Sequence, residues 1–172
     1  GNTCTIGNDE TEDVKLAYDY ISNKGEKNIV LWGISMGASS ITKTIHDFHL
    51  QPKKIILEMP FGTIEDAVKG RLKLMGLPAQ PIATLLTFWG GAERGFWAFN
   101  MKPQQYVKSF SCPVLLQWGK NDPRVSKSEE DILFNNIPGA NKKFIVYENA
   151  GHESLCKKEP EKWKTEVADF LK

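Results

Sequence analysis

Hydrophobic residues recur with two different periods along this chain of 172 residues. Between residues 9 and 23 the apolar positions fall three or four residues apart, which is the spacing of an amphipathic helix. Asp9 and Glu12 stand at the spacing of a capping box for that helix. Residues 29–32 are then apolar without interruption, which is typical of a strand buried on both faces of a parallel sheet. The pattern predicts a helix over 9–23 and a strand over 28–33.

Strand-like and helix-like segments go on alternating to the end of the chain. Helical spacing returns between Met36 and about Phe48, again after a capping box formed by Ser126 and Glu129, and again after Pro160. Three further apolar runs have the length of strands: 54–59, 113–118 and 143–147. This alternation predicts an α/β fold with a mostly parallel sheet and helices on both of its faces.

One segment interrupts the alternation. About 50 residues separate the strands at 54–59 and 113–118, although a crossover connection needs only about a dozen. We therefore expect residues 1–60 and 113–172 to form the core and residues 61–112 to form a helical cap or lid over a pocket. A helix pair that only packs against the core is the alternative. The bulky side chains expected to face the pocket are Phe88, Trp89, Phe96 and Trp97.

The overall charge gives little support to a polyanionic partner. Lysine and arginine number 22 and aspartate and glutamate 21, so the formal charge is +1 and no long block has a single sign. Binding to nucleic acid or to a membrane surface therefore has no electrostatic basis, and no apolar run reaches the roughly 20 residues of a membrane span. The three cysteines are odd in number and lack a C-x-x-C spacing, so we expect free thiols and no metal. No signal-peptide pattern is present; the compartment stays open, with the cytoplasm favoured.

The pentapeptide 33–37, Gly-Ile-Ser-Met-Gly, falls between a predicted strand and a predicted helix. A serine on such a sharp turn projects its hydroxyl above the sheet, and the glycines at 33 and 37 are expected to leave room for neighbouring elements. The amide of Met36 would start the helix and point to where an oxyanion forms. The pattern predicts a nucleophilic Ser35, against the alternative of a glycine-rich turn with an incidental serine.

A nucleophilic serine needs a base, and the base needs an acid that orients it. Asp122 follows the third predicted strand, and His152 follows the fourth. Because the carboxyl ends of parallel strands meet at one edge of a sheet, we expect both side chains beside Ser35. Glu58, at the end of the second strand, is another candidate acid, although we favour Asp122. A turn-forming aspartate and a structural histidine are the alternatives.

Four motifs together resemble the α/β-hydrolase superfamily, and within it the capped serine hydrolases of the esterase, lipase and serine-aminopeptidase types. They are the serine turn at 33–37, the Gly-x-x-Asp-x-x-Val segment at 119–125, the pair Gly151-His152 and the helix that begins Pro160-Glu161-x-Trp163. The resemblance extends from Glu12 onward. It implies an α/β-hydrolase fold, a nucleophile at Ser35, an acid at Asp122, a base at His152 and no cofactor.

The resemblance further implies an enzyme that cleaves carboxylic esters through an acyl-serine. The expected substrate is a small molecule with an apolar group rather than a highly charged one, because the predicted cap is rich in aromatic residues. A peptidase or amidase of the same fold is the alternative among enzymes. A binding domain without activity, or an inactive fragment, is the alternative from another class. The oligomeric state stays open.

The first strands of the superfamily would lie upstream of Gly1, as would the loop that supplies its second oxyanion donor. We therefore expect these residues to be the carboxyl-terminal part of a longer hydrolase. The strand at 28–33 should then expose one hydrogen-bonding edge within this chain.

Overall fold

Four parallel strands form a single sheet at the centre of the protein. The computed structural model describes residues 4–172. The strands are β1 (Val30–Ile34), β2 (Lys54–Glu58), β3 (Val114–Gly119) and β4 (Lys142–Tyr147). They lie side by side in their chain order, and every neighbouring pair is parallel. The α/β prediction with a parallel sheet is therefore confirmed.

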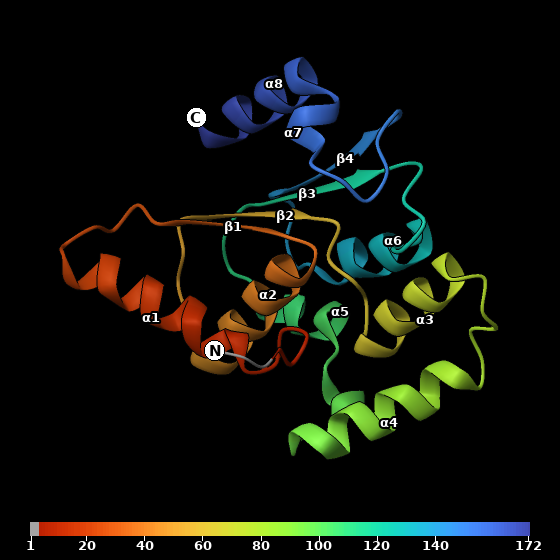
Figure 1. The fold of residues 1–172 in the computed structure, drawn as a ribbon. Coiled ribbons are helices and arrows are strands. Elements are labelled where there is room, and N and C mark those ends of the chain that lie inside the picture. Colours follow the sequence, from red (N-terminus) through yellow and green to blue (C-terminus); the bar gives the residue numbers. More distant parts are fainter. Residues whose placement is uncertain (1–3) are drawn as a thin grey trace.

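Helices cover both faces of this sheet (Figure 1). One face carries α1 (Glu10–Asn23), α2 (Met36–Phe48), α5 (Pro103–Tyr106) and α6 (Lys127–Asn136), and the opposite face carries α7 (Leu155–Lys158) and α8 (Pro160–Leu171). The cause is visible in β2, where Ile55 and Leu57 join the core cluster on the α2 side while Ile56 packs with Val167 of α8. Successive side chains of a strand point to opposite faces, so an uninterrupted apolar run builds two cores.

β1 lies at an edge of the sheet, and within residues 4–172 it pairs with β2 alone. Three of its side chains are more than a third exposed: Val30 at 37%, Trp32 at 51% and Ile34 at 41%. The prediction that this strand is buried on both faces is therefore wrong for the described chain. Residues 30, 32 and 34 alternate onto the face of α8, where the edge strand lacks the neighbours that bury a central strand, while Leu31 on the other face packs against the core on the α2 side.

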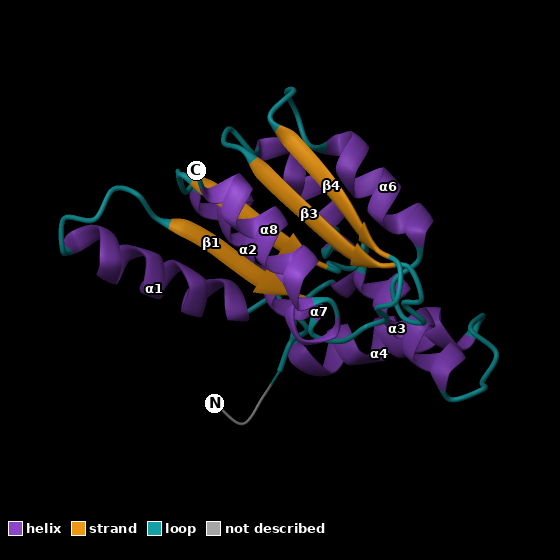
Figure 2. Cartoon of the chain, turned by 90° about the horizontal axis from the view of Figure 1, so that it is seen from above, coloured by secondary structure: helices purple, strands orange, loops and turns teal. Residues whose placement is uncertain are grey.

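The segment between β2 and β3 is mostly helical. It contains α3 (Ile64–Leu74), α4 (Ile82–Arg94), the short 3₁₀ helices η1 (Ala98–Asn100) and η2 (Val107–Ser109), and α5. Seen from above, α3 and α4 lie beyond the carboxyl ends of the strands (Figure 2). The end of the segment differs, because Val107 and Phe110 belong to the core cluster between the sheet and α2. The division into core and cap at residues 61–112 stays a prediction.

The two predicted capping boxes have different outcomes. Ser126 and Glu129 form one at the start of α6, with the hydroxyl and the carboxylate each accepting a backbone hydrogen bond. At the start of α1 the side chain of Asp9 makes no capping bond, so that prediction is wrong. The neighbouring Glu10 takes part in a different contact, because its carboxylate accepts from Thr5 N, Thr5 Oγ1 and Gly7 N at 2.8–2.9 Å. A carboxylate in the first turn of α1 thus ties down the loop before the helix.

Gly70 permits a close approach between α3 and the loop after β3. A Cβ atom at Gly70 would lie 2.2 Å from the carbonyl oxygen of Arg124 and 3.0 Å from its Cα. These are backbone atoms, so the loop itself would have to move. We expect Gly70→Ala to lower the free energy of unfolding by about 1–3 kcal/mol, the usual cost of overpacking. Urea unfolding followed by circular dichroism measures this change.

The matched control is Gly90→Ala in α4, where an added Cβ meets no atom within 4 Å. Alanine is the better residue in an open helical position, so this variant should unfold at equal or higher urea concentration. A Gly70→Ala variant as stable as Gly90→Ala would contradict the close contact between α3 and the Arg124 loop.

The contacts of Glu10 predict a pH-dependent stabilisation. Partial burial raises the pKa of Glu10, but the hydrogen bonds from Thr5 and Gly7 outweigh it and lower the pKa from 4.5 to about 2. Because the pKa is lower in the folded state, the stabilisation is complete above pH 4.5 and is lost as the pH falls toward 2. Glu10→Gln should therefore lower the urea midpoint at pH 7, and the difference from the parent should shrink below pH 4.5. Glu12→Gln, an exposed neighbour with the same change of charge, is the control; an equal loss in both variants would refute the specific role of Glu10.

Candidate active site

Ser35 occupies the sharp turn between β1 and α2. Its backbone has φ 52° and ψ −117°, a conformation that residues with a side chain seldom adopt. Two backbone hydrogen bonds hold it there: Ser35 N donates to the carbonyl of Glu58 at 2.7 Å, and the Ser35 carbonyl accepts from Ser39 N at 3.0 Å. The turn is therefore anchored both to the neighbouring strand and to the first turn of α2.

The two glycines of the turn have different roles. A Cβ at Gly33 would lie 2.6 Å from Ala38 N and 2.7 Å from the Gly37 carbonyl oxygen, so no side chain fits at this position. A Cβ at Gly37 would meet no described atom within 4 Å. The expectation of crowding is thus correct at Gly33 and wrong at Gly37, because the backbone of residue 37 lies close to Gly33 but its Cβ position points into open space.

The structure brings Ser35, His152 and Asp122 into one hydrogen-bonded line. Ser35 Oγ lies 2.8 Å from His152 Nε2, and His152 Nδ1 lies 2.7 Å from Asp122 Oδ2. The side chain of Asp122 is fully buried and that of His152 is 10% exposed. The other carboxylate oxygen, Asp122 Oδ1, accepts from the backbone amides of Arg124 and Val125 at 2.7 and 2.9 Å. The Asp122 carboxylate is therefore held at one oxygen and presents the other oxygen to the imidazole.

The loops that carry Asp122 and His152 are packed directly against each other. Asn121 N donates to the carbonyl of Ala150 at 2.9 Å. A Cβ at Gly119 would lie 2.5 Å from the Gly151 carbonyl oxygen, so glycine is required where β3 ends. This tight backbone contact fixes the separation of the loops that carry Asp122 and His152 at the carboxyl edge of the sheet.

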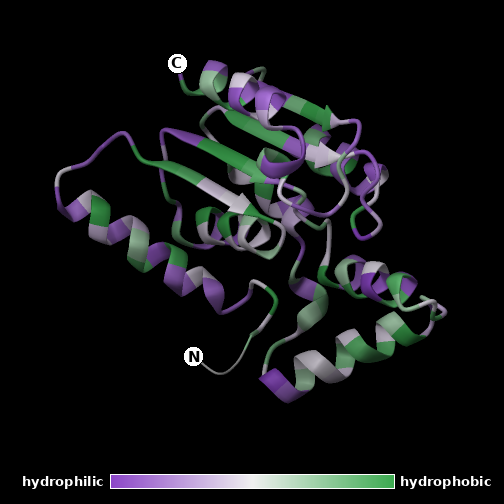
Figure 3. Cartoon of the chain, turned by 45° about the horizontal axis from the view of Figure 1, so that its top comes forward, coloured by the Kyte–Doolittle hydropathy of each residue, from purple (hydrophilic) through white to green (hydrophobic). Residues whose placement is uncertain are grey.

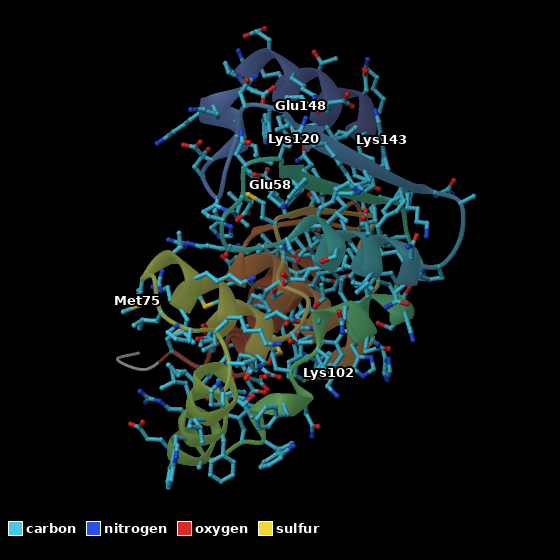
Figure 4. The ribbon with its side chains drawn as sticks, turned by 90° about the vertical axis from the view of Figure 1, so that its right-hand side faces the viewer. Glu58, Met75, Lys102, Lys120, Lys143 and Glu148 are labelled. Atoms are coloured by element: carbon cyan, nitrogen blue, oxygen red, sulfur yellow. The ribbon has the colours of Figure 1, made fainter. Side chains whose placement is uncertain are left out.

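Glu58, the other candidate acid, has different partners. Its Oε1 accepts from the indole nitrogens of Trp32 and Trp163 at 3.0 and 2.8 Å, and Gln117 Nε2 lies 3.4 Å away. Burial raises the pKa of Glu58, while the two indole hydrogen bonds lower it by a smaller amount. Glu58 lies in the interior of the protein, 1% exposed (Figure 4). The geometry therefore assigns the contact with His152 to Asp122, and Glu58 joins two tryptophans on the α8 face.

A second buried carboxyl group belongs to Glu130 of α6. Neither of its oxygens has a hydrogen-bond partner within the described chain, and the residue is fully buried. Burial, and then the nearby charge of Asp122, raise the pKa of Glu130 well above 4.5. These surroundings therefore favour the protonated form of the Glu130 carboxyl group.

A cavity of about 360 Å³ opens beside Ser35 and His152. Most of its wall is apolar, with two arginines among the lining residues. The lining comprises Cys4, Ile6, Ser35, Met36, Phe61, Ala67, Val68, Arg71, Arg124, Val125 and His152. Sequence reasoning missed Arg71 and Arg124, although one lies a helical turn beyond Val68 and the other two residues beyond Asp122.

The four aromatic residues expected in this cavity lie elsewhere, so the structure does not support that prediction. Phe88, Trp89 and Trp97 are 41, 65 and 56% exposed. Phe88 packs edge-on against both tryptophans, with ring centroids 5.4 and 6.0 Å apart. Phe96 lines a separate cavity of about 230 Å³ between α3 and α4.

The orientation of α4 explains why its aromatic side chains lie outside the cavity beside Ser35. The helix buries its small residues Ala83, Thr87 and Gly91, which recur every four positions, and a Cβ at Gly91 would lie 2.7 Å from the Phe96 carbonyl oxygen. Close packing on that face turns the bulky side chains outward, and hydrophobic residues continue along the helix surface (Figure 3). The aromatic residues that are concentrated in this segment therefore lie on an exposed face of α4 and the turn after it.

Within residues 4–172, no group of three or more histidine, cysteine, aspartate or glutamate side chains has the arrangement of a metal site. His46, one of the two other histidines, stacks on Tyr106 with the ring centroids 4.9 Å apart.

Within residues 4–172, no helix combines the length and the apolar character needed to cross a membrane.

Comparisons with known proteins give matches at low sequence identity. No family model matches the sequence. The protein YqkD of Bacillus subtilis is 24% identical over 183 residues, which cover 99% of this chain and 57% of YqkD. Lysophosphatidylserine lipase ABHD12 of Macaca fascicularis is 24% identical over 128 residues, 67% of this chain and 29% of the lipase. The chain thus spans about half the length of the first relative and less than a third of the second.

A solved structure extends the likeness to three dimensions. The esterase Pf2001 of Pyrococcus furiosus superposes with a TM-score of 0.77 at 20% sequence identity, over 99% of this chain and 64% of the esterase chain. The agreement covers the parallel sheet together with the helices on its two faces. From its sheet topology and this likeness, the chain has the α/β-hydrolase fold.

Proposed function

We propose that the protein is a serine hydrolase that cleaves carboxylic esters. The observation that carries the proposal is the continuous line of hydrogen bonds from Ser35 Oγ through His152 to the buried carboxylate of Asp122. The three residues come from three separate loops at the carboxyl edge of the sheet. Such an arrangement on a strained turn is the geometry that nucleophilic catalysis requires.

In the proposed reaction Ser35 Oγ attacks the carbonyl carbon of the ester while His152 Nε2 takes the hydroxyl proton. The Nδ1–H of the ring donates to Asp122, which fixes the tautomer and stabilises the imidazolium. His152 then returns the proton to the leaving alcohol, and an acyl-serine remains. A water molecule, deprotonated by His152, attacks this acyl group and releases the acid together with free Ser35.

The backbone amide of Met36 is the proposed oxyanion donor. Met36 is the first residue of α2, where the amides make no hydrogen bond within the helix and the helix dipole is positive. The negative charge on the carbonyl oxygen would develop beside this amide. One such donor is commonly worth about 100- to 1000-fold in rate.

The cap assignment of residues 61–112 becomes part of the proposal in a changed form. Here α3 supplies Ala67, Val68 and Arg71 to the cavity wall, while the loop at residues 4–8 supplies Cys4 and Ile6. The apolar part of the substrate would therefore contact these side chains of α3 and the loop at residues 4–8, and not the aromatic residues of α4.

Esters are favoured over amides because one structural neighbour is named an esterase and one curated relative a lipase. Cleavage of amides is the alternative, because the same three residues can act on both bonds and the pocket decides between them.

A fluorophosphonate probe tests the nucleophile. It should label the protein covalently at one serine, and the labelled peptide found by mass spectrometry should contain Ser35, since within residues 4–172 this is the hydroxyl that lies 2.8 Å from an imidazole nitrogen. Ser35→Ala should abolish the labelling. The matched control Ser22→Ala, at an exposed position of α1, should keep it. A folded parent protein that takes up no label would contradict the proposal.

Two carboxylate variants test the acid. With p-nitrophenyl hexanoate as substrate, Asp122→Asn should lower kcat by about three to four orders of magnitude, since an amide at this position favours the wrong imidazole tautomer. Glu58→Gln should lower kcat by less than about tenfold, because Glu58 contacts indoles and not His152. If the two losses were equal or reversed, the assignment of the acid to Asp122 would be wrong.

A further inference from the structure

The three arginines of the chain, Arg71, Arg94 and Arg124, have no carboxylate partner within residues 4–172. Within residues 4–172 every ion pair with a carboxylate involves a lysine, except the contact between His152 and Asp122. None of the three guanidinium groups donates a hydrogen bond to a described atom. No carboxylate oxygen of the described chain therefore lies within 4 Å of a guanidinium nitrogen, although Asp66 and Glu129 line a second cavity together with Arg124.

Two of these arginines line the cavity that contains Ser35 and His152. Arg71 extends from α3, and Arg124 belongs to the loop after β3. Figure 2 shows α3 at the carboxyl ends of the strands, beside this loop. The two side chains therefore approach the same cavity from two different elements.

The backbone beneath the two arginines is rigidly positioned. Gly70, the neighbour of Arg71, lies so close to Arg124 that an added Cβ would fall 2.2 Å from its carbonyl oxygen. The amide of Arg124 donates to Asp122 Oδ1 at 2.7 Å. The contact between Gly70 and Arg124 and the hydrogen bond from Arg124 N to Asp122 thus fix the backbone positions from which the two arginine side chains extend.

The rest of the cavity wall carries no opposing charge. Among its described lining residues there is no aspartate or glutamate, and apart from Ser35 and His152 the other side chains are apolar or contain sulfur. A positive charge beside an apolar wall attracts an anion more strongly than a charge surrounded by water. Guanidinium groups also match carboxylate and phosphate oxygens through paired hydrogen bonds.

We propose that Arg71 and Arg124 form an anion subsite of this cavity, so that the preferred ester carries a carboxylate or a phosphate group in addition to its apolar part. The inference rests on the proposed function for the identity of the reaction, but not for the binding of the anion. It modifies the expectation from the sequence, which favoured a substrate with an apolar group over a highly charged one. The apolar residues of the wall hold the hydrocarbon chain, and the two arginines hold the charged end.

Matched esters test the subsite by hydrolysis. Mono-p-nitrophenyl adipate carries a carboxylate where p-nitrophenyl 6-methylheptanoate carries an isopropyl group of similar shape. The parent protein should have the higher kcat/KM for the adipate. The ratio of the two kcat/KM values should fall about 10- to 100-fold when Arg71→Gln and Arg124→Gln are combined, the range expected for lost charge-assisted hydrogen bonds. Lys73→Gln, which removes a positive charge from α3 outside this cavity, should keep the parent ratio.

A binding experiment tests the same subsite without catalysis and distinguishes the two kinds of anion. Hexanoate, hexyl phosphate and hexanol are titrated calorimetrically into Ser35→Ala. Both anions should bind at least about tenfold more tightly than hexanol, and the combined arginine substitutions should remove this advantage. The anion that binds more tightly identifies the favoured group. Arg71→Gln alone, at an exposed position, repeats both tests if the combined variant does not fold.

The outcomes separate the two proposals. If the parent hydrolyses both esters with a ratio that the arginine substitutions leave unchanged, and hexanol binds as tightly as the anions, the anion subsite is refuted while the hydrolase stands. If neither ester is cleaved and Ser35 takes no label, yet the anions bind through the arginines, the proposed function is refuted while the subsite stands.

Discussion

The hydrogen bond from Ser35 N to the Glu58 carbonyl, 2.7 Å long, continues the pairing of β1 with β2 one residue beyond Ile34. This hydrogen bond keeps the backbone of Ser35 aligned with β2 while the chain turns sharply into α2. The backbone takes a conformation that commonly costs about 1–3 kcal/mol, and the surrounding contacts offset this cost. The position of the serine hydroxyl is therefore a consequence of strand pairing, since only a strained turn satisfies both elements.

The pairing of β2 with β3 and of β3 with β4 extends this alignment across the sheet. Glu58 pairs with Gln117, and β3 pairs in turn with β4, so the ends of the strands stay in register. The close contact at Gly119 then joins the loops that bear Asp122 and His152. Hydrogen-bond distances of 2.7 and 2.8 Å between side chains from three loops follow from this rigid edge. A shift of any strand would separate groups that nucleophilic catalysis needs in contact.

Charge is distributed unevenly around this edge. The buried carboxyls of Glu58 and Glu130 have raised pKa values because burial disfavours their charged forms. The carboxylate of Asp122 accepts hydrogen bonds from two backbone amides and lies within hydrogen-bond distance of His152. On the cavity side the exposed charges are the guanidinium groups of Arg71 and Arg124. The wall of the cavity therefore carries positive charge, although the formal charge of the whole protein is only +1.

The sequence by itself determined the order of strands and helices and the loops from which Ser35, Asp122 and His152 extend. These features depend on local periodicity, and parallel strands always bring their carboxyl ends to one edge. Only the tertiary structure decided which side chains fill the cavity. The aromatic residues of α4 face outward because the small residues on its opposite face pack more closely, and Glu58 binds indoles because β1 and α8 place Trp32 and Trp163 beside it. Arg71 and Arg124 line one cavity because Gly70 lets α3 approach a loop some 50 residues away in the chain, a contact between distant segments that no local pattern encodes.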